Sequence, residues 1–202
     1  MPGSNANAIA VLRIELEDIE PLIWRRVAAP TSMSLKDLHG VIQAVMGWRD
    51  CHLWEFVTQG RKYGLRISND PDWNQRISNA VTIKLSSLGT DGVKDMTYVY
   101  DMGDNWQHRI IVEKLTPAEP DTRYPQFLGG ERRCPPEDCG GVPGYYGFLD
   151  NISSKQTKKR KAALDWYGGP YDPNDIDEDR IVATLGRLAR GRHSDQSKAV
   201  KT

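Results

Sequence analysis

The chain contains 202 residues, of which 39% are hydrophobic and 27% are charged, as expected for one folded domain. Its 27 basic and 27 acidic side chains give a formal net charge of zero, which argues against a dedicated nucleic-acid-binding protein. The sequence has no apolar run near the roughly 18 residues of a membrane span and no signal peptide, so no membrane partner is expected. Three cysteines fit a reducing compartment and predict a cytoplasmic protein.

The first predicted elements are a hairpin and a helix. Residues 9–17 alternate apolar and polar side chains, which places Leu12, Ile14 and Leu16 on one face of a half-buried strand. Residues 22–27 are predicted to be its partner strand.

The helix should begin after Ser34, a suitable N-cap, with Asp37 as an acid in the first turn. Apolar residues continue at helical spacing to Met46, and Gly47 is expected to end the helix. His39 lies at the edge of the apolar face and is expected to be a partly buried structural histidine.

Two more hairpins are predicted in the middle of the chain. The expected strand pairs are residues 52–57 with 62–67, and residues 97–101 with 106–114. Between them, residues 68–80 are polar and are predicted to be a loop, and residues 81–85 to be a short strand.

Helices dominate the last part of the sequence, after a loop-rich segment at residues 118–143. The predicted helices span residues 145–151, 157–167 and 176–189. Strands early and helices late predict an α+β domain over residues 9–190, with a mostly antiparallel sheet built from hairpins. Residues 1–8 and a basic tail at 191–202 are predicted to be disordered.

Two segments concentrate acids, metal-ligand types and turn residues. They are residues 98–108 and 130–141. In the first, Asp101, Asp104 and His108 would form a polar cluster suited to a ligand or a metal. Trp106 shares a strand face with His108 and would add an aromatic surface. Alternatively, Asp104 and Asn105 serve only the turn, because aspartate side chains bond nearby backbone amides.

His52 belongs to a third segment with potential ligands. It alternates with Trp54 and Phe56, so these side chains are predicted to share one face of a strand. If that face meets the strand that carries His108, the two histidines and Asp101 could bind a divalent metal. The alternative is a packed, hydrogen-bonded histidine.

Cys134 and Cys139 form a Cys-x4-Cys pair within the second segment. This spacing falls in the range of zinc ligands, although only Cys51 and His52 could supply a second pair. Zinc is therefore one interpretation, with Cys134, Cys139, His52 and His108 as candidate ligands. The alternative is a rigid loop in which the cysteines pack as small hydrophobic residues.

Several motifs together resemble one protein family. They are Ile23-Trp-Arg-Arg-Val27, Leu38-His39 with Met46-Gly-Trp48, His52-Leu-x-Glu-Phe56, Tyr100-Asp-x-Gly-Asp-x-Trp-x-His108 and Cys134-Pro-Pro-Glu-Asp-Cys-Gly-Gly141. In this order the chain resembles the plasmid pRiA4b ORF-3-like family from about residue 9 to residue 185. One departure is Met102-Gly-Asp-Asn105, where the resemblance leads us to expect Phe-Gly-Asp-Gly. The resemblance implies a cytoplasmic protein, often encoded on plasmids or mobile elements, with no established activity and no catalytic residues to transfer.

The first functional hypothesis is a non-enzymatic binding module of mobile-element origin, with an unknown ligand or protein partner. Its site would combine the segments at 52–56, 101–108 and 134–141. The candidate ligand-binding residues are His52, Trp54, Asp101, Asp104, Trp106, His108, Glu137 and Asp138.

Two further hypotheses stay open. In a metal-dependent hydrolase, His52, His108 and Asp101 would hold the metal, with Asp104 or Glu137 as general base. A nucleic-acid accessory protein would use the five basic residues between 155 and 161, for which a solvated helix face is the commoner explanation.

Overall fold

The computed structural model describes residues 8–67, 71–89 and 95–199 of the chain. Its strands are β1 (Ala8–Leu16), β2 (Ile23–Pro30), β3 (Trp54–Thr58), β4 (Arg61–Gly64), β5 (Ser78–Asn79), β6 (Asp95–Tyr100), β7 (Trp106–Pro117) and β8 (Gln126–Glu131). Its helices are α1 (Leu35–Met46), α2 (Pro71–Arg76), α3 (Leu85–Gly89), α4 (Gly141–Ser153), α5 (Thr157–Tyr167) and α6 (Glu178–Ala199).

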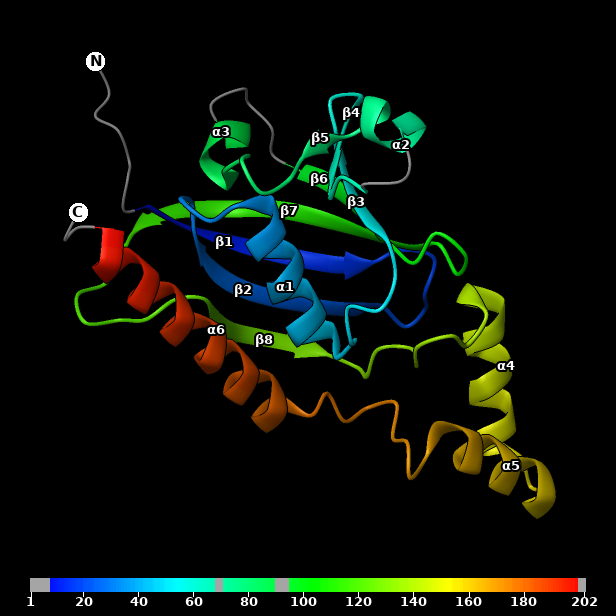
Figure 1. Ribbon diagram of the computed structural model, residues 1–202. Helices are drawn as coiled ribbons and strands as arrows, with labels where there is room; N and C mark the ends of the chain where they lie inside the picture. The colour runs from blue at the N-terminus through cyan, green and yellow to red at the C-terminus, as the bar shows by residue number, and fades with distance from the viewer. Residues whose placement is uncertain (1–7, 68–70, 90–94, 200–202) are drawn as a thin grey trace.

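One twisted sheet organises the described residues. The strand order is β5-β4-β3-β6-β7-β1-β2-β8, and the neighbouring strands run antiparallel except β4 and β5. In Figure 1, α1 crosses the sheet, α6 runs alongside α1 and β8, and α4 and α5 lie at one end. The predicted α+β fold with a mostly antiparallel sheet is confirmed.

The hydrophobic core lies between the sheet and α1. Leu12, Ile14 and Leu16 have no exposed surface, which confirms the inner face predicted for β1. β1 pairs with β2, as the predicted hairpin requires, and also with β7 on its other side. Because β1 is therefore central to the sheet, its backbone groups are satisfied along both edges.

The two ends of α1 follow the predicted capping pattern. The Ser34 hydroxyl accepts a hydrogen bond from the Asp37 N–H at 3.1 Å, and the Asp37 carboxylate accepts one from the Ser34 N–H at 3.3 Å. Gly47 ends the helix with φ at +90°, a conformation that costs glycine little. His39 is buried and forms hydrogen bonds with Tyr98 and Asp50, so the prediction that it is a structural histidine is confirmed.

Several local predictions were wrong. β8 lies inside the segment predicted as loop, where Gln-Phe-Leu-Gly-Gly-Glu has weak strand propensity and pairs with β2 through long-range contacts. α2 and β5 occupy part of the loop predicted at 68–80, of which residues 68–70 lie outside the described residues. The strand predicted at 81–85 is reduced to an isolated bridge between Lys84 and Ser34, and α3 begins at Leu85.

The chain ends also differ from expectation where they are described. α6 continues to Ala199, past the boundary predicted at residue 190, so the described part of the tail is helical. Of the N-terminal segment predicted to be disordered, only Ala8 is described, and it is the first residue of β1. None of the helices in the described ranges is both long and apolar enough to cross a membrane.

Candidate functional site

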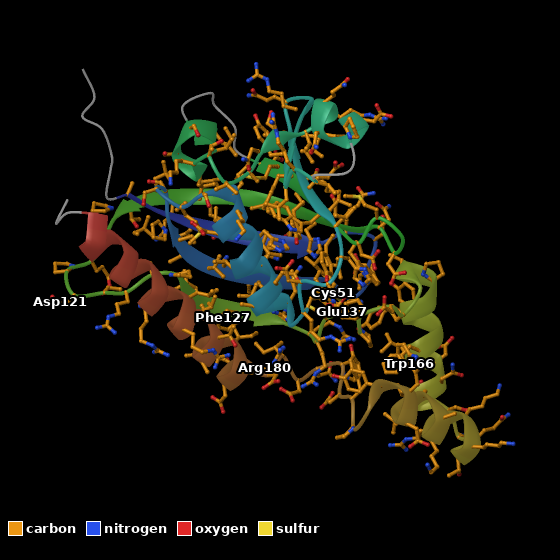
Figure 2. All side chains as sticks on the ribbon, viewed as in Figure 1. Cys51, Asp121, Phe127, Glu137, Trp166 and Arg180 are labelled. Atoms are coloured by element: carbon orange, nitrogen blue, oxygen red, sulfur yellow. The ribbon has the colours of Figure 1, made fainter. Side chains whose placement is uncertain are left out.

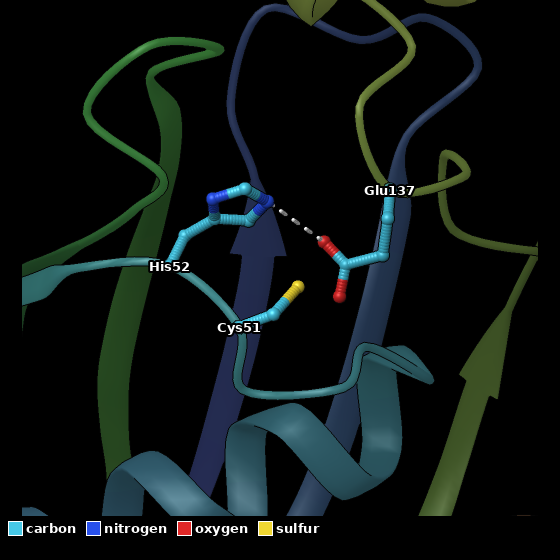
Figure 3. Close-up of side chains that lie close together, drawn as sticks. All are labelled: Cys51, His52 and Glu137. Carbon is cyan, nitrogen blue, oxygen red and sulfur yellow. Dashed lines mark ion pairs between the residues drawn. The ribbon is translucent and has the colours of Figure 1, made fainter.

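Three connecting segments meet where β3 begins and β6 ends. They are residues 47–53 after α1, the turn at 101–105 and the loop at 132–140 between β8 and α4. Figure 2 shows Cys51 and Glu137 close together beside the C-terminal end of α1, and Figure 3 shows His52 facing Glu137. Connections carried on a rigid sheet are a common location for binding residues.

Asp101 holds the 101–105 turn and also faces the site. Its backbone has φ at +57°, and its Oδ1 accepts hydrogen bonds from the N–H groups of Gly103 at 2.9 Å and Asp104 at 3.3 Å. The other carboxylate oxygen, Oδ2, points to His52 at 3.5 Å from Nε2. One carboxylate oxygen of Asp101 therefore stabilises the turn, and the other faces His52.

Asp104 fixes the 132–140 loop to this turn. Its carboxylate accepts a hydrogen bond from the Gly140 N–H at 3.1 Å. A Cβ on Gly141 would lie only 2.7 Å from the Asp104 carbonyl oxygen, so the close approach requires glycine. Asp104 thus has a structural role, but its carboxylate bonds Gly140, 36 residues away, and not a nearby turn amide as the alternative prediction supposed. It places the loop that carries Glu137 and Asp138.

His52 lies at the centre of a cluster of carboxylates. Its Nε2 is 3.0 Å from Asp138 Oδ1, 3.5 Å from Asp101 Oδ2 and 4.0 Å from Glu137 Oε2. That nitrogen is shielded from solvent and has no hydrogen-bond partner within the described residues. Three of the predicted site acids therefore converge on the predicted histidine.

Glu137 is also held by two residues outside the predicted site, Arg49 and Tyr100. Its Oε1 accepts hydrogen bonds from the Arg49 N–H at 2.7 Å and from the Tyr100 hydroxyl at 3.1 Å. Burial raises the pKa of the Tyr100 hydroxyl, which therefore stays protonated and donates. The Tyr100 oxygen in turn accepts from the Cys51 N–H at 3.2 Å. No sequence pattern pointed to Arg49 or Tyr100 as contacts of Glu137, although Tyr100 lies in the segment 98–108.

Two overlapping groups have ligand-type atoms within 4.8 Å of one another. One contains His52, Asp101 and Asp138, and the other contains Cys51, His52 and Glu137. Both groups contain His52. This residue does not lie on a strand, because β3 begins at Trp54 and His52 belongs to the segment before it. The predicted alternation of His52 with Trp54 and Phe56 on one strand was therefore wrong.

His108 belongs to the core and to neither group. It has no exposed surface, and its Nδ1 lies within 3.3 Å of the carbonyl oxygens of Tyr98 and Trp106. Its ring packs perpendicular to that of Trp48, with 5.2 Å between the ring centroids. Burial lowers the pKa of His108 to about 4, so the imidazole is neutral near pH 7. The structure therefore does not bring His108 to His52, as a shared metal would require.

Trp54 and Trp106 are also core residues. Trp54 is 4% exposed and stacks on His39 at 4.1 Å between ring centroids, and Trp106 is 1% exposed. Neither indole has the surface that the predicted apolar contact with a ligand would need. The predicted aromatic surface is thus internal packing beneath the site.

The Cys-x4-Cys pair does not join the described ligand groups. Cys134 is buried against Arg25 and Met46, and burial raises the pKa of its thiol. Burial likewise raises the pKa of the Cys139 thiol to about 12, so this thiol is protonated near pH 7. These positions match the alternative in which both cysteines pack as small hydrophobic residues.

Fold and site together define a class: an α+β protein whose antiparallel sheet carries a cluster of histidine and carboxylate side chains at one end. A family model described as "Plasmid pRiA4b ORF-3-like protein" matches residues 8–180. The chain therefore belongs to the plasmid pRiA4b ORF-3-like family, as its motifs predicted.

Two known proteins are similar to the chain over most of its length. "Uncharacterized protein y4hQ" of Sinorhizobium fredii (strain NBRC 101917 / NGR234) is 36% identical over 167 residues, which span 82% of this chain and 84% of that protein. The crystal structure of a "Protein of Unknown Function MM3350 from Methanosarcina mazei Go1" is 34% identical, with a TM-score of 0.74 over 84% of this chain and 95% of that one. Neither name assigns a function.

Proposed function

We propose that the chain is a binding module for a divalent transition-metal cation, held by His52, Asp101 and Asp138. The observation that carries this proposal is the environment of His52 Nε2. This buried nitrogen has three carboxylates within 4.0 Å and no hydrogen bond within the described part of the chain. A cation would give the nitrogen a partner and offset the mutual repulsion of the carboxylates.

The separations of the ligand atoms suit a common metal. Two atoms about 2.1 Å from one cation lie about 3.0 Å apart in octahedral coordination and about 3.4 Å apart in tetrahedral coordination. The 3.0 Å and 3.5 Å distances from His52 to Asp138 and Asp101 are close to these values. Small side-chain adjustments would therefore complete the site, with Glu137 as a nearby further carboxylate.

The donor types favour particular metals. Imidazole nitrogen suits zinc and iron, and carboxylate oxygen suits manganese, whereas copper(I) prefers thiolate and thioether ligands. One imidazole with two or three carboxylates therefore favours Zn²⁺, Fe²⁺ or Mn²⁺. The group of His52, Asp101 and Asp138 contains no thiolate ligand, because the exposed Cys51 belongs to the other group.

The hydrolase and nucleic-acid hypotheses receive less support. A hydrolase would need a general base beside the metal. Of the two predicted bases, the Asp104 carboxylate is hydrogen-bonded to Gly140, and Glu137 lies beside His52. The basic residues of α5 are exposed, as a solvated helix face would be. An origin on mobile elements stays a prediction from the family resemblance, and a cytoplasmic location stays a prediction from that resemblance and from the three cysteines.

The test is metal content by mass spectrometry on untagged full chain purified without chelator, followed by titration of the stripped protein with Zn²⁺ and Mn²⁺. About one equivalent should bind, and His52→Ala should abolish it. Asp150→Asn, which removes a carboxylate on α4 away from the site, is the matched control. If the stripped chain takes up neither metal, His52 is only an ion-pair partner of these acids and the proposal is wrong.

A further inference from the structure

A cleft of about 590 Å³ adjoins the proposed metal site. Its walls come from the end of α1, the loop at 132–140, the end of α5 and the start of α6. Glu137 and Asp138 belong both to this cleft and to the cluster around His52. In Figure 2, Arg180 and Trp166 appear below Glu137 on opposite sides of it. A ligand in the cleft would therefore lie beside two carboxylates of the cluster around His52.

Arginine is the main charged residue type of this cleft. The lining includes Arg25, Arg49, Arg133 and Arg180. Arg25 is 1% exposed, and its guanidinium donates to the carbonyl oxygens of Val45, Glu131 and Arg132. These carbonyls satisfy its hydrogen bonds but leave its positive charge without a carboxylate partner in the described residues.

Two of these arginines are held in place by acids. Arg133 forms an ion pair with Asp175 at 2.8 Å, and Arg180 forms one with Asp177 at 2.9 Å. The Arg180 guanidinium lies over Gly47, where a Cβ would overlap it. Both guanidinium groups are therefore fixed on the wall rather than free in solvent, which lowers the entropy lost when they bind an anion.

Arg49 stands at the junction between the cleft and the cluster. Its backbone N–H donates to Glu137 at 2.7 Å, which fixes the start of its side chain beside the proposed cation. Its guanidinium is exposed and forms no ion pair within the described ranges. It is the arginine most available to an incoming anion, and guanidinium matches phosphate through paired hydrogen bonds.

Trp166 supplies an aromatic surface in the same cleft. Its side chain is 54% exposed, although its ring also contacts Phe148 at 5.7 Å between centroids. An indole held on one side and open on the other is suited to stacking with a planar ring. The cleft therefore combines cationic groups, a flat aromatic surface and a volume within the range of small-molecule sites.

We infer that this cleft binds a phosphorylated small molecule with a planar ring, of the mononucleotide type. Its phosphate would lie between Arg49 and the cation, and its ring would stack on Trp166. The cation part of this inference rests on the proposed function. Without a cation, Glu137 and Asp138 would repel the phosphate, so metal and ligand should bind with positive coupling.

The experiment is calorimetric titration of the metal-loaded full chain with AMP, ribose 5-phosphate and inorganic phosphate. AMP should bind most tightly, and stripping the metal should weaken it. Arg49→Gln should weaken AMP and ribose 5-phosphate alike, by about tenfold, because a charge-assisted hydrogen bond is lost. Trp166→Ala should weaken AMP by about tenfold and leave ribose 5-phosphate unchanged. Arg187→Gln, an exposed arginine of α6 outside the cleft lining, is the control.

Metal content measured on the same samples separates this inference from the proposed function. A chain that holds metal but binds none of the three probes, or whose Arg49→Gln variant binds AMP like the parent, overturns the cleft inference. A chain that takes no metal yet binds AMP through Arg49 and Trp166 supports the cleft and overturns the metal site and the coupling. Thermal melts of each variant establish that it is folded before titration.

Discussion

The Nε2 atom of His52 lies 3.0 Å from Oδ1 of Asp138, although one residue precedes β3 and the other follows β8. The two meet because the 132–140 loop is fixed to the 101–105 turn by Asp104 and Gly140. The Asp138 side chain is 64% exposed. The backbone of this residue has φ at +56°, a conformation that asparagine also tolerates.

Asp138→Asn should therefore separate metal binding from stability. We expect the affinity for Zn²⁺ or Mn²⁺ to fall by about tenfold or more, because an anionic ligand becomes neutral. The free energy of unfolding should change by less than about 0.5 kcal/mol, since the side chain is exposed. Competition titration with a chromogenic chelator and urea unfolding measure the two quantities. Unchanged metal affinity would remove Asp138 from the proposed ligands.

Asp101 and Asp104 should differ although both lie in one turn. Asp101→Asn keeps an oxygen for the turn amides but loses the charge that faces His52, so metal affinity should fall by about tenfold or more. Asp104→Asn can still accept from Gly140 and should retain nearly all of the affinity. The same competition titration compares the two variants. Equal losses would mean that Asp104 also binds the metal.

Cys51 distinguishes the two overlapping ligand groups. If the cation sits among His52, Asp101 and Asp138, Cys51→Ser should leave the metal affinity unchanged. A large loss would instead assign the cation to the group of Cys51, His52 and Glu137. Absorption of the Co²⁺-substituted protein gives an independent reading, because a thiolate ligand adds an intense charge-transfer band that Cys51→Ser would remove.

Gly141 tests the docking of the loop on the turn. Gly141→Ala places a Cβ 2.7 Å from the Asp104 carbonyl oxygen at a residue with φ at +66°, so it should destabilise the fold by about 1–3 kcal/mol. Metal affinity should fall with it, because Asp138 is displaced. Gly186→Ala in α6, where the nearest atom is 3.6 Å away, should instead be neutral or stabilise by about 0.5–1 kcal/mol. Urea unfolding of both variants provides the comparison.

His108 should make stability depend on pH. Burial lowers its folded-state pKa to about 4, whereas the unfolded value is about 6.5. The unfolded chain therefore binds the proton first as pH falls, so stability is full above about pH 6.5 and declines down to about pH 4, by about 3 kcal/mol in total.

Replacing His108 by phenylalanine keeps an aromatic ring in the core and removes the titration. Unfolding free energies measured from pH 7.5 to 4 should then fall less steeply for His108→Phe than for the parent chain. Parallel pH profiles for the two proteins would show that His108 does not titrate as its burial requires.

Local sequence signals determined the elements whose stabilising contacts are near in the chain. The capping pair of Ser34 and Asp37, Gly47 at the end of α1 and the inward alternation of β1 each depend on neighbouring residues, and the structure agrees with them. The family motifs likewise identified the family, and the sequence singled out the acids and His52 as candidate site residues.

Tertiary structure decided what depends on partners distant in the sequence. β8 forms because β2 offers a pairing edge, and His108 and Trp106 are internal because β7 packs its inner face into the core. Arg49 and Tyr100 contact the candidate site because the 132–140 loop brings Glu137 to them. A sequence specifies which side chains can bind a cation, but their convergence follows from loop docking and sheet order, which no local pattern encodes.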